Sequence, residues 1–193
     1  MTGFMMPGLA ALAGVVLGGG AAQEADDVQT FGAWEVRHFH NRSGPSYEHG
    51  ARASLLTRDG FISVECRRQG EATLLVGWQP NARLGGLNDY EPREVTVRWD
   101  RGPASVEPWE AFVGGAWKRD DAYARAFADR LGASSAVTLA TADERGRRQE
   151  RTYRLGPAAD TQAAMARVQE DCRRGWHQDP GNEKRPVIAD RAS

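Results

Sequence analysis

The chain has 193 residues, 25 basic and 26 acidic side chains, and a formal net charge of −1. A balance this close to neutral excludes the large basic surface that binding to nucleic acids or to anionic membranes requires. Only Lys118 and Lys184 are lysines, and acidic residues are interspersed among the many arginines. We therefore expect no nucleic-acid partner.

The N-terminal residues 4–17 form an apolar run, which the small residues Gly18 to Ala22 follow. This order is typical of a secretory signal peptide, and the run is too short and too rich in glycine to span a bilayer. No lysine or arginine precedes the run, so a misassigned start codon or a buried N-terminal helix is the alternative. We expect a signal peptide over 1–22, a periplasmic or secreted protein, and no transmembrane anchor after cleavage.

The residues that follow alternate between apolar and polar side chains, which is the pattern of half-buried strands. The turn residues Asp59-Gly60 and Arg68-Gln69-Gly70 divide 51–78 into a predicted meander of three strands. The segments with the strand pattern are 31–36, 51–55, 61–66, 72–78 and 95–99.

From residue 120 the period changes to that of a helix. Asp120 and Asp121 can cap a helix that ends at Gly132 and whose apolar face carries Tyr123, Phe127 and Leu131. Two further strands are predicted over 136–140 and 149–155, and a second helix runs from Asp160 or Thr161 to Cys172. We expect one domain over 23–174, followed by a mobile tail over 175–193. The fold class is α+β, a mostly antiparallel β-sandwich-like sheet with two helices.

Cys66 and Cys172 are the only cysteines of the chain. Two thiols in an exported domain most simply form one disulfide, which would fix the second helix to the strand of Cys66. A redox pair or a metal site is the alternative, but the chain has no C-x-x-C spacing and no histidine within a few residues of Cys66. We therefore expect a structural disulfide between Cys66 and Cys172.

Several short motifs resemble those of small bacterial envelope proteins, namely the VasI-like proteins associated with type VI secretion and, more loosely, the invasion-associated locus B proteins. The motifs are Gly32-Ala33-Trp34, Val64-Glu65-Cys66, Val97-Arg98-Trp99-Asp100, Pro108-Trp109, Phe127 to Leu131, and Tyr153 to Gly156. The resemblance covers most of 31–172 and implies a β-sandwich-like periplasmic protein with an accessory role. It brings no functional residues, and 38–50 departs from the expected pattern.

Two sets of residues are candidate sites. His38 and His40 lie on one face of a predicted strand, and His49 could return beside them to form a zinc or copper site. An exposed edge strand is the alternative that we favour, so we expect no metal and no other cofactor. The tryptophans could form a platform for a ligand or a partner, or they could line the rim of the core. These tryptophans are Trp78, Trp99, Trp109 and Trp117.

Motifs of hydrolases are missing from the sequence, which contains no G-x-S-x-G, no H-E-x-x-H and no P-loop. We therefore expect an exported protein that is not an enzyme and that acts as an accessory or protein-interaction factor for an unidentified envelope protein, with an association with secretion as one form of that role. The alternative function is a periplasmic module that binds a small ligand in a Trp-lined pocket or a metal at His38, His40 and His49.

Overall fold

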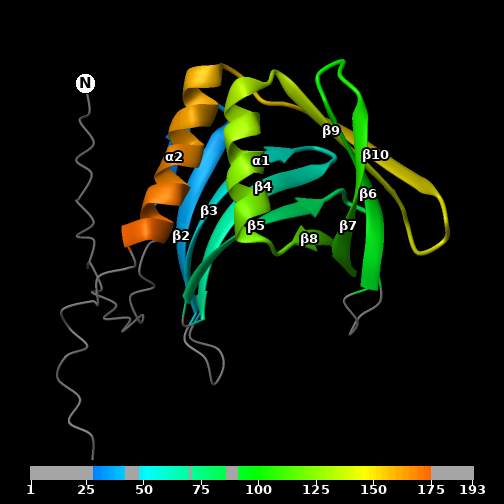
Figure 1. Cartoon of the computed structure of the whole chain (residues 1–193), viewed down its shortest axis with the longest axis horizontal. Coiled ribbons are helices and arrows are strands. Elements are labelled where there is room, and N and C mark those ends of the chain that lie inside the picture. The colour runs from blue at the N-terminus through cyan, green and yellow to red at the C-terminus, as the bar shows by residue number, and fades with distance from the viewer. Residues whose placement is uncertain (1–27, 42–47, 70, 86–90, 175–193) are drawn as a thin grey trace, which may run out of the picture.

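The fold is described from a computed structural model, which defines residues 28–41, 48–69, 71–85 and 91–174. The described residues form ten strands and two helices (Figure 1). The strands are β1 (Val28–Phe31), β2 (Trp34–Asn41), β3 (Glu48–Thr57), β4 (Gly60–Gln69), β5 (Glu71–Gln79), β6 (Glu91–Trp99), β7 (Ala104–Phe112), β8 (Gly115–Lys118), β9 (Ala136–Ala142) and β10 (Arg148–Arg154). The helices are α1 (Asp121–Ala133) and α2 (Ala158–Arg174).

All ten strands belong to one sheet, in the order β1-β2-β3-β4-β5-β8-β7-β6-β9-β10, and every neighbouring pair is antiparallel. The predicted meander over 51–78 is confirmed as β3, β4 and β5. The single strand predicted over 31–36 is instead a hairpin, because the chain turns at Gly32, whose φ is +58°. A side chain there would also collide with Asp160.

The sheet bends back on itself, so that strands far apart in the strand order contact each other (Figure 1). Trp78 of β5 donates a hydrogen bond from Nε1 to the Tyr153 hydroxyl of β10, at 3.0 Å. Near the same place, Arg151 Nε donates to the carbonyl of Asp59 at 3.2 Å. The α+β class is confirmed, but a sandwich is not, because one continuous sheet supplies both sides of the core.

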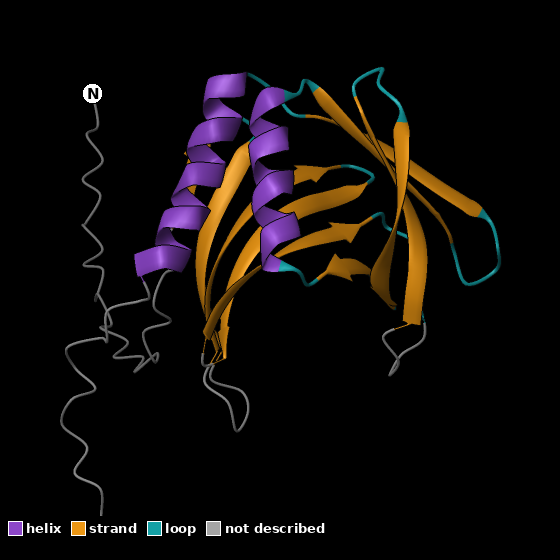
Figure 2. Cartoon of the chain, in the orientation of Figure 1, coloured by secondary structure: helices purple, strands orange, loops and turns teal. Residues whose placement is uncertain are grey.

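Both helices lie on the inner face of the bend, where α2 packs against β1 to β5 and α1 packs against β5 and α2 (Figure 2). The predicted cap of α1 is confirmed, since the Asp120 carboxylate accepts a hydrogen bond from Tyr123 N at 2.9 Å. Helix α2 starts at Ala158, two residues earlier than the first predicted start. The Pro157 carbonyl accepts hydrogen bonds from the backbone N–H groups of Asp160 and Thr161.

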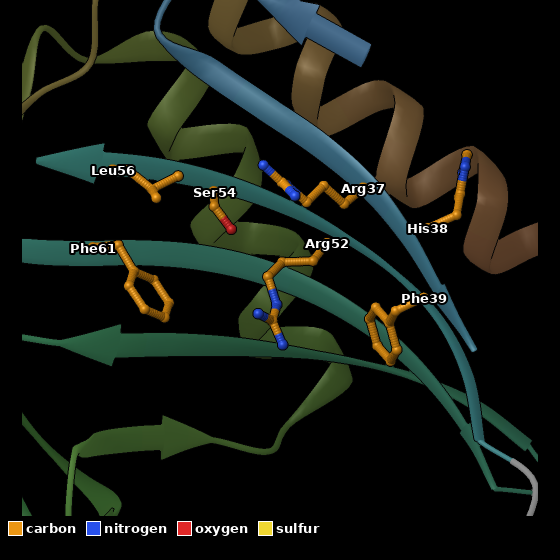
Figure 3. Close-up of a pocket in the computed structure, with 7 residues that line it drawn as sticks. All are labelled: Arg37, His38, Phe39, Arg52, Ser54, Leu56 and Phe61. Atoms are coloured by element: carbon orange, nitrogen blue, oxygen red, sulfur yellow. The ribbon is translucent and has the colours of Figure 1, made fainter. Parts of the chain in front are cut away.

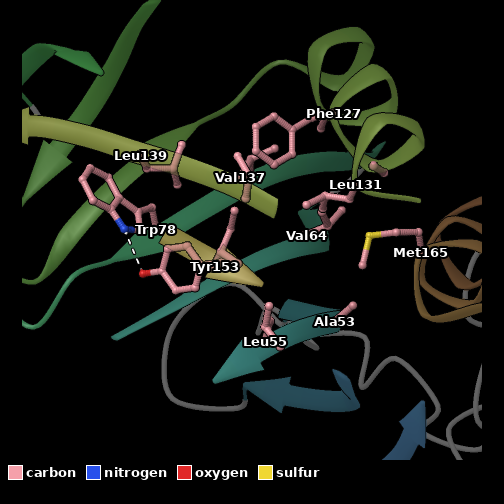
Figure 4. Close-up of a cluster of buried hydrophobic side chains, with 14 of the residues drawn as sticks. Ala53, Leu55, Val64, Trp78, Phe127, Leu131, Val137, Leu139, Tyr153 and Met165 are labelled. Carbon is pink, nitrogen blue, oxygen red and sulfur yellow. Dashed lines mark hydrogen bonds between the residues drawn. The ribbon is translucent and has the colours of Figure 1, made fainter. Parts of the chain in front are cut away.

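The core lies between the helices and the inner face, and it is built from the inward side chains of nearly every element (Figure 4). Met165 and Val168 of α2 are 3% and 0% exposed, as their helical spacing predicts. The disulfide between Cys66 and Cys172 is confirmed, with a Cα–Cα distance of 5.5 Å. It joins the end of α2 to the middle of the sheet across 106 residues of sequence.

Within the described part of the chain, no helix has the length and apolar character needed to cross a membrane. The predicted signal peptide over 1–22 and the predicted tail over 175–193 lie outside the described residues.

Candidate binding surface on the outer face of the sheet

The two faces of strands β2 to β5 differ in what covers them. Inward side chains such as Val36, Ala53 and Val64 are fully buried beneath the helices. On the other side, which we call the outer face, no helix of the described residues covers the strands (Figure 2). Even so, Ser63 and Glu65 point to this outer face and are 0% and 2% exposed. Neighbouring side chains must therefore bury them.

Glu65 is the centre of an ionic cluster on the outer face. Its carboxylate pairs with Arg52 of β3, with an Nε–Oε1 distance of 2.9 Å, and with Arg67 of β4, with an Nη2–Oε2 distance of 3.0 Å. Ser63 Oγ donates a hydrogen bond to Oε1 at 3.0 Å. The arginine side chains are 35% and 25% exposed, whereas that of Glu65 is 3% exposed. The guanidinium groups therefore cover the carboxylate.

An aromatic ring lies at each end of this cluster, and each ring lies over a glycine of the neighbouring strand. Phe39 pairs in register with Gly50, where a Cβ would come within 2.1 Å of the ring. Trp117 of β8 pairs with Gly77 of β5, which also leaves room for Ser63. These two glycines have no special backbone conformation. A Cβ would collide with the Phe39 ring and the Cys66 carbonyl at Gly50, and with Ser63 Oγ at Gly77.

The arginines also lie over the rings. The Arg52 guanidinium carbon is 5.5 Å from the Phe39 centroid, and those of Arg67 and Arg119 are 4.6 and 4.8 Å from Trp117. Stacking on an aromatic ring and pairing with a carboxylate hold a guanidinium group in one orientation. We call this row the arginine–aromatic band; it consists of Phe39, Arg52, Glu65, Arg67, Trp117 and Arg119.

A depression of about 330 Å³ adjoins the band over β2, β3 and β4 (Figure 3). Its lining combines cationic and apolar groups, and Leu56 is 57% exposed. Arg37 and Arg52 are register partners on neighbouring strands, so their side chains lie on the same face. The lining residues are Arg37, His38, Phe39, Arg52, Ser54, Leu56 and Phe61.

The other half of the outer face carries a second depression, of about 550 Å³, over β6, β7 and β9. Its charged lining has both signs, with Glu91 and Glu94 beside Arg93 and Arg148, and Val106 is 60% exposed. No aromatic side chain lines it among the described residues. The two depressions therefore differ in charge and in aromatic content.

The structure does not bring the three histidines of the predicted cluster together among its described side chains. The His38 side chain turns inward toward α2 (Figure 3), where Nε2 lies 2.8 Å from Asp171 Oδ2. Arg167 Nε lies 3.1 Å from the same oxygen. His40 and His49 are register partners, but their side chains lie outside the described residues. Among the described residues, no group of three or more possible ligands could hold a metal ion.

The four candidate tryptophans lie in three places. Trp78 is in the core with Tyr153, and Trp117 is in the arginine–aromatic band. Trp99 and Trp109 both lie against Phe127 of α1, with ring centroids 4.8 and 6.3 Å from the Phe127 centroid. Trp78 and Trp117 are on neighbouring strands, but Trp78 pairs with Ala116 and Trp117 with Gly77. One residue of register thus places them on opposite faces.

Three polar side chains, those of Glu107, Trp109 and Tyr123, lie together between β7 and α1. Trp109 Nε1 and Glu107 Oε2 are buried and make no hydrogen bond of standard geometry in the described structure, although both side chains interact with the Tyr123 hydroxyl. Burial raises the pKa of the Tyr123 hydroxyl far above its usual value, and the Glu107 carboxylate raises it further. Together, the buried Trp109 donor, the buried Glu107 acceptor and the neutral Tyr123 phenol can bind a small polar molecule or a water.

The ionic cluster was not predicted as a site, although the sequence contains a signal for it. The Asp59-Gly60 turn fixes the register of β3 and β4, and counting back from the turn pairs Arg52 with Glu65. The pairing of Trp117 with Gly77 has no local signal, because β5 and β8 are far apart in the sequence.

No protein-family model and no curated protein matches the chain. Among solved structures, the chain is similar to the crystal structure of invasion associated protein B from Bartonella henselae. The TM-score is 0.43 and the identity 10%, over 74% of this chain and 98% of that chain. A likeness at this level shows neither a family nor a function, so membership of the VasI-like or locus B-like proteins stays a prediction.

Proposed function

We propose that the protein is an exported, non-enzymatic accessory factor of the bacterial envelope that binds a protein partner through the outer face of its sheet. The observation that carries this proposal is the arginine–aromatic band, in which Glu65 is 2% exposed on a face that no described helix covers. Arginine and aromatic side chains are enriched at protein interfaces and supply many of the residues that dominate binding energy.

Stability alone gives little reason for such a cluster. The cost of removing charges from water offsets most of the attraction within a buried ion pair, and apolar residues of similar size often serve the fold as well. The cluster instead fixes Arg52 and Arg67 against Phe39 and Trp117 before any partner arrives. A surface that is ordered in advance loses less conformational entropy on binding.

Export is supported by two features. The apolar N-terminal run with its small-residue end is typical of a signal peptide. The disulfide between Cys66 and Cys172 is of the kind that persists in an oxidising compartment.

The proposal is tested by introducing a photo-crosslinking amino acid at one position of each side. Leu56 lies on the outer face, and Ala126 is an exposed position of α1 on the helical side. Irradiation of intact cells should give a discrete protein adduct from position 56 and none from position 126. Adducts from position 126 alone, or none from either, would contradict the proposal.

A second candidate function is the binding of a small molecule between β7 and α1. Trp109 Nε1 and Glu107 Oε2 favour it, because buried polar atoms usually have well-formed hydrogen bonds and these two atoms have none of standard geometry. Native mass spectrometry of protein purified from the envelope tests this function. A bound small molecule that is lost in Glu107→Gln would support it, and an unliganded mass would count against it.

A further inference from the structure

The first depression carries an excess of positive charge at its centre. Arg37 and Arg52 are register partners, and like charges in directly opposed positions of a sheet repel each other. Arg37 pairs with Glu35 at 2.8 Å, but both side chains are exposed, at 52% and 36%, so water weakens the pair. Arg52 shares the single carboxylate of Glu65 with Arg67. The described lining of the depression therefore places two guanidinium groups side by side and includes no carboxylate.

Apolar side chains lie at both ends of this positive centre. Figure 3 shows Leu56 and Phe61 at one end of the depression, Phe39 at the other, and the two arginines between them. Leu56 and Phe61 are register partners, so they form one apolar end. A strand rises about 3.3 Å per residue, which places the Leu56 end about 13 Å from Arg52 and the Phe39 end about 7 Å from it.

We propose that this depression binds an extended segment of the partner protein in which one acidic side chain is flanked on both sides by apolar side chains. The proposal rests on the proposed function and specifies the chemistry of the partner. A carboxylate can accept paired hydrogen bonds from a guanidinium group, and it would relieve the repulsion between Arg37 and Arg52. The apolar side chains would cover Phe39 at one end and Leu56 with Phe61 at the other.

The spacing in the depression defines a probe. It is a fluorescent peptide with a glutamate, a phenylalanine about two residues to one side and a leucine about four residues to the other, with serine and glycine elsewhere. The reversed sequence is included, because the depression does not fix the direction of the chain. Matched peptides replace the glutamate by lysine, or both apolar residues by serine.

Binding of these peptides to the full-length protein is measured by fluorescence anisotropy. We expect the glutamate peptide to bind more weakly as salt increases, and the lysine and serine peptides to fail. Arg37→Glu and Leu56→Ser should each weaken binding on the order of tenfold.

The other half of the sheet offers two matched controls. Arg148 pairs with Glu150 two residues away, as Arg37 does with Glu35, and it is 65% exposed. Val106 is exposed to about the same extent as Leu56. Arg148→Glu and Val106→Ser should leave peptide binding within about twofold of the unmodified protein. Thermal melts of all four variants show that each is folded.

The inference is overturned if neither glutamate peptide binds, or if Arg148→Glu weakens binding as much as Arg37→Glu does. The crosslinking experiment reports separately on the proposed function. An adduct at position 56 without peptide binding would support the outer face as the binding surface. It would contradict the proposal that the bound segment carries an acidic side chain between apolar ones. Loss of both results would reject the function itself.

Discussion

The inner and outer faces of strands β2 to β5 each bury one carboxylate, but by different means. On the inner face, Asp171 is 10% exposed because helix α2 carries it against the sheet, where it meets His38 and Arg167. On the outer face, Glu65 is 3% exposed, and its own partners Arg52 and Arg67 are the groups that cover it. The inner carboxylate is part of the attachment of a helix, whereas the outer carboxylate organises a surface.

This difference separates residues that hold the fold from residues that shape a surface. Changes on the inner side should alter the cooperativity and stability of folding. Changes on the outer side should cost less stability and should act on binding. The two faces can thus be tested independently, starting from the change with the largest expected effect.

Removal of α2 should have the largest effect. A chain that ends at Gly156 loses Met165 and Val168, each of which contributes about 1.5–3 kcal/mol through burial. It also uncovers the inner face of β1 to β5. Because the net stability of a domain is only about 5–15 kcal/mol, we expect no cooperative thermal transition by circular dichroism. A chain that ends at Arg174 keeps every described element and should melt like the full-length protein. Equal melting of both chains would show that α2 is peripheral.

Loss of the disulfide should be the next largest effect. Replacing both Cys66 and Cys172 with alanine removes a covalent link between residues that are 106 positions apart. Such a change lowers the free energy of unfolding by about 2–5 kcal/mol. Urea denaturation measures the loss. Intact mass with and without reductant, followed by alkylation, checks that the unmodified protein is oxidised. Two freely alkylated thiols in native envelope material would contradict the structural role.

Glu65→Gln tests the outer face and should cost less. It leaves two arginines without a counter-charge, but both are partly exposed and can recover water, so we expect a loss of about 1–3 kcal/mol in urea denaturation. Glu150→Gln is the matched control, because Glu150 pairs with Arg148 on the exposed surface of β10, and it should cost less than about 0.5 kcal/mol.

A triple replacement tests whether the outer cluster serves the fold or the partner. Arg52→Met, Glu65→Leu and Arg67→Met together remove the charges of the cluster and keep much of its volume. We expect this variant to fold with a stability close to that of the unmodified protein, and to lose the crosslink at position 56. A stable variant that still crosslinks would mean that the cluster serves the fold and not the partner.

The elements that could be predicted from sequence are those with a local signal. The meander follows from the alternation of apolar residues between turns, and α1 follows from the Asp120 cap and its apolar spacing. The pairing of Cys66 with Cys172 could be predicted because the chain has no other cysteine. In each case a few neighbouring residues, or a unique partner, decide the result.

What sequence could not predict depends on pairing between distant strands. β7 contains a proline and is exposed at four of its first five positions, and β8 has only four residues, so neither shows a clear alternation. Because β8 could not be predicted, the pairing of Trp117 with Gly77 could not be predicted either, and neither could the arginine–aromatic band that contains Trp117. Composition alone allows a tryptophan platform, but strand register places Trp78 and Trp117 on opposite faces of the sheet.

A smaller loss of stability than that from removing α2 or the disulfide is expected at the contact that joins the two sides of the bend. Tyr153→Phe removes the acceptor for Trp78 Nε1 and leaves that donor buried without a partner, which should cost about 1–2 kcal/mol at neutral pH. Burial raises the pKa of Tyr153 to about 12, although the Trp78 hydrogen bond opposes the shift. The folded state thus holds the phenol proton more tightly than the unfolded state, whose tyrosines titrate near pH 10.

The sign of the pH dependence follows from this difference. The stability that Tyr153 contributes is fully present below about pH 10 and is lost as the pH rises toward 12. Few other groups interfere, because the chain has only two lysines and four tyrosines, while its arginines stay charged in this range. The raised pKa of Tyr123 acts in the same direction. Urea denaturation between pH 9 and 12 should therefore show a decline in stability that is shallower in Tyr153→Phe. An equal decline in both proteins would place the alkaline loss elsewhere in the chain, and the bend would then not depend on a neutral phenol.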